Sequence, residues 1–367
     1  MIKFAIDVSW LRPGKIGGIE SYVRNLLDGF TVIDEDFHIS LIVSKDNAET
    51  FVQYDNSDKF SIIKTPVNAI ERIKTLYWTS TQLDKLISFL KVDFCFVPNS
   101  RMPLLRTKNR YITTMHDLQP FHYPEYFNRL RIIWLKYSWK RIINKSLRVV
   151  VISNFVREDV LDKYHCRKDK LVTIYNPIAN LNSFCDFDIL SKKYGINEGD
   201  YFYTISSLLR HKNTDTLFRL MLELKKHGVN KKLLISGIKG DYADALKDFV
   251  EGHKLEDTCI FTGFVTNEER NTLMKHAQFF LFPSIFEGFG MPVVEALMLG
   301  TKVITTKRAS IEEVSQGKAI YVDNPFDEKE WMQKIKENEK LQIDPIPFRE
   351  YSCDTIARQY LNLFKSL

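Results

Sequence analysis

Two acidic residues flank a glycine-containing turn in the stretch PSIFEGFGMPVVEALMLG, residues 283–300. Glu287 lies at the turn and Glu295 in the helix that follows it, with seven residues between them. Pro292 suits the first position of that helix, because its missing N–H would be unpaired there. The free amides and positive end of the helix point into the turn and favour an anion. Because carboxylates suit hydroxyl groups, the stretch predicts a site for a phosphate joined to a polyol, as in a nucleotide sugar.

Two cations lie in a second loop, after a predicted strand at 201–205. Arg210 and Lys212 suit a diphosphate, which stays negatively charged throughout a transfer reaction. Taken alone, two such residues are more often a solvated surface pair. Beside the anion-binding turn they predict a phosphate clamp. Phe264 and Val265 follow a further predicted strand, where backbone groups can contact the edge of a base.

The first half of the chain has its own group of candidate residues. Gly17 and Gly18, Asn99, and His116 with Asp117 each follow a predicted strand. Because parallel strands end at one edge of a sheet, we expect these residues to share a ligand-binding edge. The glycine loop is not the G-x-G-x-x-G dinucleotide fingerprint. Core packing is the alternative role for His116.

A basic segment at 129–148 carries seven Lys and Arg residues, no acid, and Trp134, Tyr137 and Trp139. A basic aromatic helix can lie on an anionic membrane surface. The alternative is a helix that packs its apolar side on a sheet and leaves its basic face solvated.

The spacing of apolar residues predicts strands that alternate with helices. Predicted strands lie at 3–9, 38–43, 60–64, 94–97, 111–115, 149–152, 201–205, 232–236, 259–262, 278–282 and 302–305. Predicted helices lie at 19–30, 70–90, 129–147, 214–226, 241–252, 267–276, 292–299, 327–338 and 352–367. This alternation indicates an α/β fold with parallel, doubly wound sheets.

A length of 367 residues favours two domains. We expect a first domain at 1–178, an irregular linker at 179–199, a second domain at 200–345 and a C-terminal helical segment at 346–367. The net charge of +6 is unevenly spread, because residues 1–180 hold 27 Lys and Arg against 19 Asp and Glu. Nucleic acid, an anionic membrane or an anionic substrate would each suit this excess, but no nucleic-acid-binding motif accompanies it.

The composition predicts a protein of the cytoplasm. No run approaches the roughly 18 apolar residues of a membrane span. The start, MIKFAIDVSW, lacks the regions of a signal peptide. The five cysteines are scattered and form no CxxC pair, which argues against disulfides and a zinc site.

Several of these segments resemble retaining glycosyltransferases of the GT-B fold, specifically glycosyltransferase family 4 (group 1). The matching segments are residues 17–20, 116–118, 151–155, 207–213 and 283–296. The stretch HDLQPFHYPEYF is most similar to the mannosyltransferase-like branch, which builds bacterial surface polysaccharides. The resemblance implies two Rossmann-like, doubly wound domains that face a central cleft, the first binding acceptor and the second binding donor. It also implies that the C-terminal helix at 346–367 crosses back to the first domain.

The resemblance also implies roles for the matched residues. Glu287 would hold hydroxyls of the transferred sugar, and Glu295 would bind the ribose of the nucleotide. Arg210 and Lys212 would neutralise the leaving diphosphate, so that neither a metal nor another cofactor is expected. The donor-binding set is Gly18, Ser207, Arg210, Lys212, Phe264, Val265, Glu287, Gly288, Phe289, Gly290, Met291 and Glu295.

His116 would face the sugar and phosphate from the first domain, and Gly18 would approach the phosphate on domain closure. The catalytic set is then His116, Glu287, Arg210 and Lys212. We assign Asn99 and Asp117 to acceptor binding. Asp186-Phe187-Asp188 matches the metal-binding DxD signature of a different glycosyltransferase architecture, but it lies in the predicted linker, away from the phosphate residues.

The chain departs from the family pattern at a few positions. Ser206 stands where the family usually has Gly, beside the phosphates, and Lys302 replaces a usual Pro. Gln119 stands where the mannosyltransferase-like branch often has Ile. The last two departures bear on the subgroup, and therefore on the donor.

The sequence thus predicts transfer of a hexose, with retention, from a nucleoside-diphosphate sugar to a sugar hydroxyl of a glycan or lipid-linked glycan. The branch suggests GDP-mannose, while UDP- and dTDP-sugars stay open. The rivals are a GT-B nucleotide-sugar epimerase or hydrolase, and a non-catalytic partner subunit. The protein would be cytoplasmic or peripheral on the inner face of the plasma membrane through 129–148.

Overall fold

Runs of aromatic and β-branched residues form the strands of two separate sheets in the computed structural model, which describes all residues except 16, 106, 238–239 and 241. Contacts divide the chain into two units. Unit 1 comprises Met1–Ile178 and Glu350–Leu367, and unit 2 comprises Ala179–Arg349. Each unit is described by itself.

The sheet of unit 1 has seven strands in the order β3-β2-β1-β4-β5-β6-β7, and all its pairs are parallel. The strands are β1 (Ile2–Asp7), β2 (Phe37–Val43), β3 (Phe60–Lys64), β4 (Phe94–Val97), β5 (Tyr111–Met115), β6 (Arg148–Val151) and β7 (Leu171–Thr173). Most of their residues are buried, because both faces of a parallel sheet are covered by helices.

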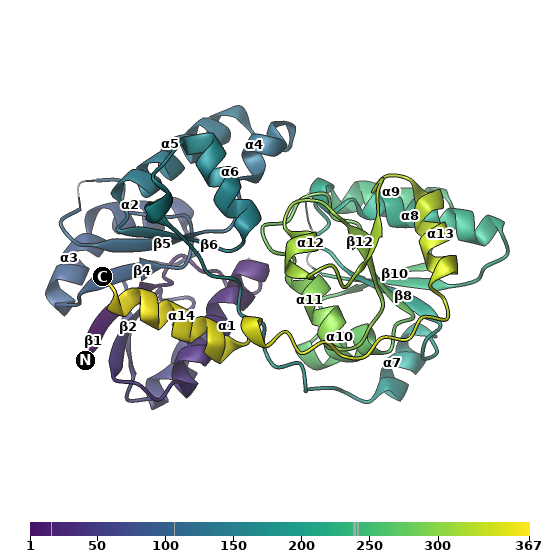
Figure 1. The fold of residues 1–367 in the computed structure, drawn as a ribbon, viewed down its shortest axis with the longest axis horizontal. Coiled ribbons are helices and arrows are strands. Elements are labelled where there is room, and N and C mark those ends of the chain that lie inside the picture. The colour runs from purple at the N-terminus through teal and green to yellow at the C-terminus, as the bar shows by residue number, and fades with distance from the viewer. Residues whose placement is uncertain (16, 106, 238–239, 241) are drawn as a thin grey trace. The chain divides into compact units, whose positions relative to one another are not determined.

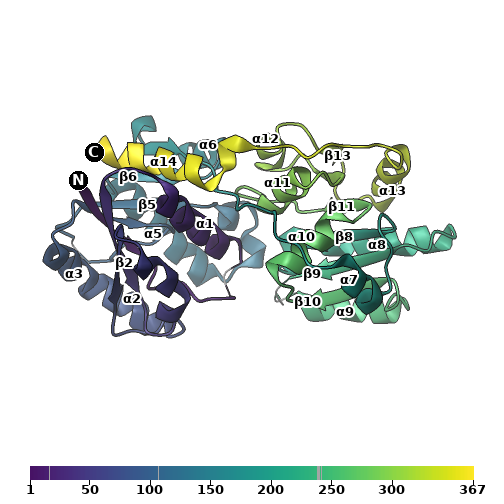
Figure 2. The same cartoon turned by 90° about the horizontal axis from the view of Figure 1, so that it is seen from below.

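The helices of unit 1 are α1 (Gly18–Val32), α2 (Arg72–Thr81), α3 (Leu83–Leu90), α4 (Gln119–His122), α5 (Arg129–Lys145), α6 (Asn154–Tyr164) and α14 (Cys353–Lys365). Short 3-10 turns include η1 (Ala48–Asn56), η2 (Pro124–Tyr126) and η3 (Lys168–Lys170). From β1 the chain moves to β2, and from β5 it moves to β6, in the opposite direction across the sheet. Right-handed crossovers therefore place α1 and α5 on opposite faces of the sheet (Figure 2).

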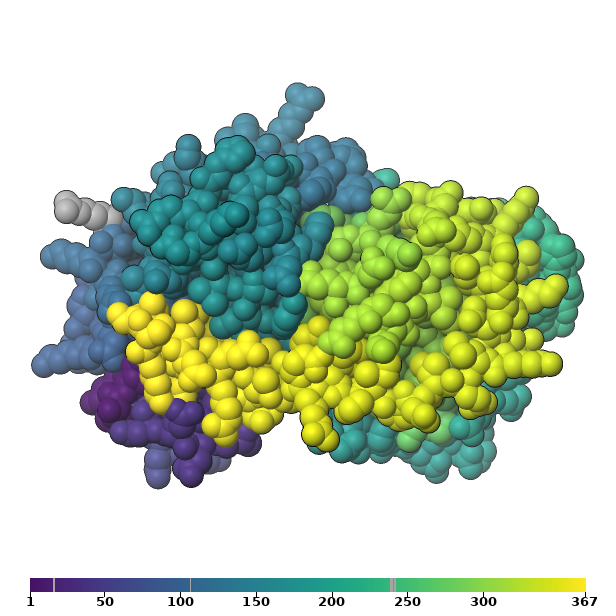
Figure 3. Space-filling view, viewed as in Figure 1, coloured from purple at the N-terminus to yellow at the C-terminus, as the bar shows by residue number. Residues whose placement is uncertain are grey.

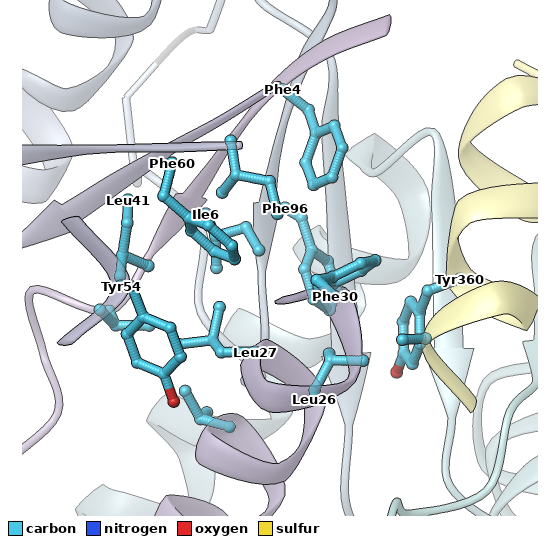
Figure 4. Close-up of a cluster of buried hydrophobic side chains, with 14 of the residues drawn as sticks. Phe4, Ile6, Leu26, Leu27, Phe30, Leu41, Tyr54, Phe60, Phe96 and Tyr360 are labelled. Atoms are coloured by element: carbon cyan, nitrogen blue, oxygen red, sulfur yellow. The ribbon is translucent and has the colours of Figure 1, made fainter. Parts of the chain in front are cut away.

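Helix α14 completes the core of unit 1, although it is the last helix of the sequence. It lies beside α1 (Figure 1), and in Figure 3 its yellow residues lie against the purple N-terminal residues. The ring of Phe364 is 4.9 Å from those of Phe4 and Phe94, centroid to centroid. Tyr360 enters the same cluster (Figure 4), and its hydroxyl is 2.6 Å from that of Tyr22 on α1.

The sheet of unit 2 has six parallel strands in the order β10-β9-β8-β11-β12-β13. They are β8 (Tyr201–Ile205), β9 (Lys232–Ser236), β10 (Cys259–Gly263), β11 (Phe279–Phe282), β12 (Val303–Thr306) and β13 (Ile320–Val322). The helical elements are α7 (Phe187–Tyr194), η4 (Arg210–Lys212), α8 (Thr214–Lys226), α9 (Ala243–Gly252), α10 (Asn267–Lys275), α11 (Met291–Met298), α12 (Ile311–Val314) and α13 (Glu328–Glu337).

The predicted α/β class with two doubly wound parallel sheets is confirmed. The predicted helix at 70–90 is in fact two helices, α2 and α3, with a break at Gln82. Strands β7 and β13 were not predicted, because three residues are too short for a recognisable alternation. The predicted helix start at 241 lies outside the described residues.

The predicted irregular linker at 179–199 is wrong in one respect, because it contains α7. Asp186 caps the first turn of this helix, Leu190 is buried, and Gly195 ends it in the left-handed conformation. These are ordinary helix start and stop signals, so the helix was recognisable from its sequence.

Candidate active site

The candidate residues of unit 2 gather at the carboxyl ends of β8 and β11, which are neighbours in the sheet. From β8 the chain continues to β9 on one side, and from β11 it continues to β12 on the other. Such a switch point is where ligands bind in open parallel sheets. The fold therefore brings together the glycine turn and the cationic loop that the sequence singles out.

Two serine hydroxyls hold the backbone of the turn. The Ser310 hydroxyl is 2.9 Å from the carbonyl oxygen of Glu287 and 3.0 Å from that of Phe289. Ser284 donates toward the carbonyl oxygens of His211 and Phe286. Gly290 precedes α11 with a φ of 93°, a conformation that favours glycine. The turn is thus held in place with the helix amides of α11 at its end.

Lys212 and Glu287 form an ion pair, with the lysine Nζ 2.6 Å from the glutamate Oε1. Both side chains are mostly buried, at 19% and 13% exposed. The neighbouring His211 is neutral at pH 7, because burial and then the charge of Lys212 lower its pKa to about 4. The pair therefore offers a cation for a phosphate and a carboxylate for a hydroxyl at adjacent positions.

Asn213 joins the loops around this ion pair, and the sequence did not single out its role. Its amide nitrogen donates to the carbonyl oxygens of Pro283 and Pro325, at 3.3 and 2.9 Å. The backbone amide of Ile285 also donates to the carbonyl of His211, at 2.9 Å. Asn213 has a φ of 51°, and an asparagine in a polar loop is a signal for this left-handed conformation. The cationic loop and the turn are thus fastened to one another.

Arg210 is exposed and lies over the ring of Tyr242, 4.8 Å from the guanidinium carbon to the ring centroid. The half-exposed Ser207 lies on the same loop. The hydroxyl of the buried Ser206 accepts from the amide of Leu208 at 3.0 Å, which stabilises the loop. The serine at this family-atypical position therefore has a structural role that glycine could not fill.

Glu295 is buried in α11, with Oε1 3.5 Å from a guanidinium nitrogen of Arg270. Phe264, which is 81% exposed, and the half-buried Val265 follow β10. In the sheet, β10 is three strands from β11, which corresponds to roughly 15 Å at the usual strand spacing. Phe264 and Val265 therefore lie away from the ion pair, at a separation that an extended nucleotide spans.

In unit 1, His116 is buried at the end of β5, and its Nε2 is 3.1 Å from the carbonyl oxygen of Pro98. Burial lowers the pKa of this imidazole to about 4, so it is neutral at pH 7. Because a carbonyl oxygen can only accept, Nε2 carries the proton and Nδ1 is the acceptor. The ring also meets Tyr22 edge-on, with centroids 4.9 Å apart.

The other candidate residues of unit 1 lie at the ends of neighbouring strands. The side chain of Asp117 accepts from the amide of Gln119 at 2.9 Å, and that of Asn99 from the amide of Ser100 at 2.6 Å. Gly18 is exposed and begins α1. Strands β1, β4 and β5, which precede these residues, are adjacent in the sheet. Unit 1 thus places its predicted residues at one edge.

Metal binding has no ready set of ligands in the residues that the structure describes. Among them, no group of three or more His, Cys, Asp and Glu side chains could hold an ion. The Asp186-Phe187-Asp188 sequence has a different use, because Asp186 accepts from the amide of Asp188 at 2.9 Å and caps α7.

No helix in the described ranges has the length and hydrophobicity to cross a membrane.

Comparisons with known families match nearly the whole chain. Residues 16–179 match the model described as Glycosyltransferase Family 4, and residues 186–352 match the model described as Glycosyl transferases group 1. The O-antigen chain mannosyltransferase RfbU of Salmonella typhimurium is 29% identical over 275 residues, which are 75% of this chain and 72% of that protein.

Solved structures share the fold at low sequence identity. The sucrose-phosphate synthase of Thermosynechococcus elongatus superposes with a TM-score of 0.78 at 17% identity, covering 100% of this chain and 99% of the other. The Anabaena protein Alr3699/HepE, solved with UDP and glucose, has a TM-score of 0.74 at 16% identity and is covered completely in both directions.

Proposed function

Because the chain belongs to glycosyltransferase family 4 (group 1), we propose that it moves a hexose from a nucleoside-diphosphate sugar to a sugar hydroxyl, with retention of anomeric configuration. The Lys212–Glu287 ion pair at the switch point of unit 2 carries this proposal. It supplies the cation that a leaving diphosphate needs beside the carboxylate that sugar hydroxyls need.

Catalysis would be mainly electrostatic. Lys212, Arg210 and the amides that begin α11 would stabilise the charge of the diphosphate as the glycosidic bond breaks. We assign this neutralisation to the protein alone, without a metal ion. The attacking hydroxyl would approach the face that the diphosphate leaves, and a phosphate oxygen would take its proton. The unprotonated Nδ1 of His116 would accept a hydrogen bond from a substrate hydroxyl.

We propose GDP-mannose as the first donor to test and a lipid-linked glycan as the acceptor, in the synthesis of a bacterial surface polysaccharide. The similarity to an O-antigen chain mannosyltransferase supports this choice. We place the enzyme in the cytoplasm, a reducing compartment that suits free thiols. All five cysteines are free, namely Cys95, Cys166, Cys185, Cys259 and Cys353.

The donor assignment predicts selective stabilisation in a thermal-shift panel of nucleoside diphosphates and their sugars. A ligand that binds the folded state at about 100 times its Kd adds about 2.7 kcal/mol to the free energy of unfolding. We expect one base to raise the melting temperature most, with GDP and GDP-mannose as the leading pair. Product analysis with and without acceptor then separates transfer from hydrolysis or epimerisation. No shift with any nucleotide would contradict the donor site.

We also propose that α5 docks unit 1 on an anionic bilayer. Four large apolar residues of this helix are exposed, at 76% for Leu130, 65% for Ile133, 41% for Trp134 and 60% for Tyr137. Their spacing of three or four residues puts them on one face. Exposed cations flank this face, namely Arg129, Arg131, Lys136, Lys140 and Lys145.

A neighbouring helix extends the same kind of surface. Helix α2 exposes Ile73 and Tyr77, at 84% and 70%. The loop after β4 connects the two helices, because Arg141 of α5 donates to the carbonyls of Pro103 and Leu105, while Ser80 of α2 accepts from the amide of Leu104. Exposed apolar side chains beside the basic residues of α5 match the interface of an anionic membrane, which binds both kinds of side chain.

Liposome sedimentation checks this docking. Each basic residue near an anionic surface contributes about 1 kcal/mol, so Lys136→Glu with Lys140→Glu should lower the partition coefficient about tenfold or more. Arg141 is left intact, because it holds the loop after β4. The matched control is Arg167→Glu with Lys168→Glu on the exposed turn η3, which should bind like the wild type. Unchanged sedimentation of the α5 variant would remove the proposal.

A further inference from the structure

Three arginines of unit 1 lie in segments that follow strands of its sheet. Arg12 lies in the loop after β1, Arg101 lies in the loop after β4, and Arg72 begins α2, within the connection from β3 to β4. Strands β1 and β4 are neighbours from which the chain moves to opposite sides, to β2 and to β5. Arg12 and Arg101 therefore lie in the loops that flank the switch point of unit 1, the position where open parallel sheets bind ligands.

The three side chains are close enough to affect one another. Desolvation of the guanidinium is the largest cause of the lowered pKa of Arg101; the charge of Asp7, next in size, raises this pKa, and the charges of Arg12 and Arg72 lower it. The pKa of Arg12 is lowered by partial burial and then by Arg72. The three form a repulsive cationic cluster, which an anion would relieve.

Among the neighbouring carboxylates, Asp7 partly offsets the charge of Arg101, and the others are paired elsewhere. Within the described ranges, no ion pair joins Arg12, Arg72 or Arg101 to an acid. The carboxylates nearby have other partners, because Glu20 pairs with Arg24 at 2.9 Å and Glu71 with Lys74 at 2.5 Å. Asp7 is fully buried and accepts from the amide and hydroxyl of Ser9.

The arrangement also orients one guanidinium. Arg101 is exposed as a residue, yet its guanidinium lies over the buried ring of Trp10, 5.5 Å from the centroid. The indole nitrogen of Trp10 is fixed in turn by the carbonyl of Asp7, at 2.9 Å. Stacking on an aromatic ring leaves the N–H edge of a guanidinium free to bind phosphate through two parallel hydrogen bonds.

We propose that Arg12, Arg72 and Arg101 bind a phosphate or diphosphate group carried by the acceptor substrate. The assignment rests on the proposed glycosyl transfer, since it gives unit 1 the acceptor. The donor diphosphate already has Lys212 and Arg210 in unit 2, so the cluster is a second anion site with its own ligand. The acceptor would then be a sugar attached to a lipid through a phosphate ester, or a phosphorylated sugar.

Calorimetric titration with three probes tests this site. Inorganic pyrophosphate, inorganic phosphate and farnesyl diphosphate are titrated into the whole protein, with the donor site first filled by a saturating nucleoside diphosphate. In Arg12→Ala with Arg72→Ala, we expect the affinity for farnesyl diphosphate to fall about tenfold or more for each lost guanidinium. Arg101→Lys keeps the positive charge but not the two parallel N–H donors of the guanidinium, so its affinity for farnesyl diphosphate should fall less. The control, Arg167→Ala with Lys168→Ala, should bind like the wild type.

Three results would overturn the proposal. The first is that the double variant binds the diphosphate probes as tightly as the wild type. The second is that the nucleoside diphosphate displaces them from the wild type, which would assign the arginines to the donor. The third is that only inorganic pyrophosphate binds with arginine dependence, which would make the cluster a site for a free anion. Absence of glycosyl transfer with arginine-dependent binding intact would refute the proposed function and leave the anion site standing.

Discussion

The Lys212→Ala variant is expected to transfer sugar about a thousandfold more slowly than the wild type while it stays folded. Removal of the ammonium leaves the charge of the departing diphosphate without its nearest cation, and it also frees the Glu287 carboxylate, 2.6 Å away, to move. Both effects raise the barrier of the chemical step. Steady-state kinetics with the donor found in the nucleotide panel measures the loss.

Glu287→Ala should have a similar effect, because the sugar loses the carboxylate that holds its hydroxyls. The double variant should be little worse than either single variant, since the two side chains act as one unit. Circular dichroism and the melting temperature check that each variant is folded. A partly buried cation left unpaired costs stability, so a modest fall in melting temperature is expected.

A second lysine–glutamate pair of unit 2 provides a matched control. The Nζ of Lys226 lies 2.6 Å from Oε1 of Glu223 in the last turn of α8. The lysine side chain is 57% exposed, so this pair lies at the surface. Lys226→Ala removes the same contact at the same distance and should leave turnover unchanged. Turnover near the wild-type rate in Lys212→Ala would refute the assignment of the site.

Gly29→Ala is expected to destabilise unit 1 by about 3 kcal/mol or more, the upper range for an overpacked core. An added Cβ would lie 2.1 Å from the carbonyl oxygen of Cys353 and 2.8 Å from the Cβ of Ala357, so α14 would have to move away from α1. The rings of Tyr360 and Phe364 would move with it. In an open helix the same change would be stabilising by up to about 1 kcal/mol.

Chemical denaturation followed by circular dichroism measures this loss. Gly18→Ala is the matched control, because it is the same substitution in the same helix and a Cβ there meets nothing within 4 Å. The control should unfold at the denaturant concentration of the wild type or slightly above it. Equal stability of the two variants would mean that α1 and α14 do not pack as described.

The sequence predicted those parts of the structure whose causes are local. The turn at residues 283–300 was recognisable because its glycines, proline and acids follow one another within a few positions. The same holds for most strands and helices, in which the apolar spacing is itself the signal. Helix α7 is an exception, because its capping residues are local but its polar surroundings are typical of a linker.

The contacts that hold the site are not local, and they could not be predicted from one sequence. Asn213 binds Pro283 and Pro325, which are 70 and 112 positions away, and Ser310 binds Glu287 across 23. A serine or asparagine in a loop has many possible partners, and only the folded chain selects one. The partner of α14 was expected only from the family resemblance, because the pattern of an amphipathic helix shows which face is apolar but not what covers it.

The placement of α14 has a consequence for synthesis on the ribosome. All of unit 2 separates Ile178 from Glu350, so the first segment of unit 1 emerges long before the helix that completes its core. At about 5–20 residues per second, the apolar rings of Phe4, Phe94 and Phe96 wait about 13 to 72 s for Phe364. Unit 2 is continuous in sequence and can finish folding first. We therefore expect the nascent N-terminal segment to bind chaperones that shield apolar surface until translation reaches α14.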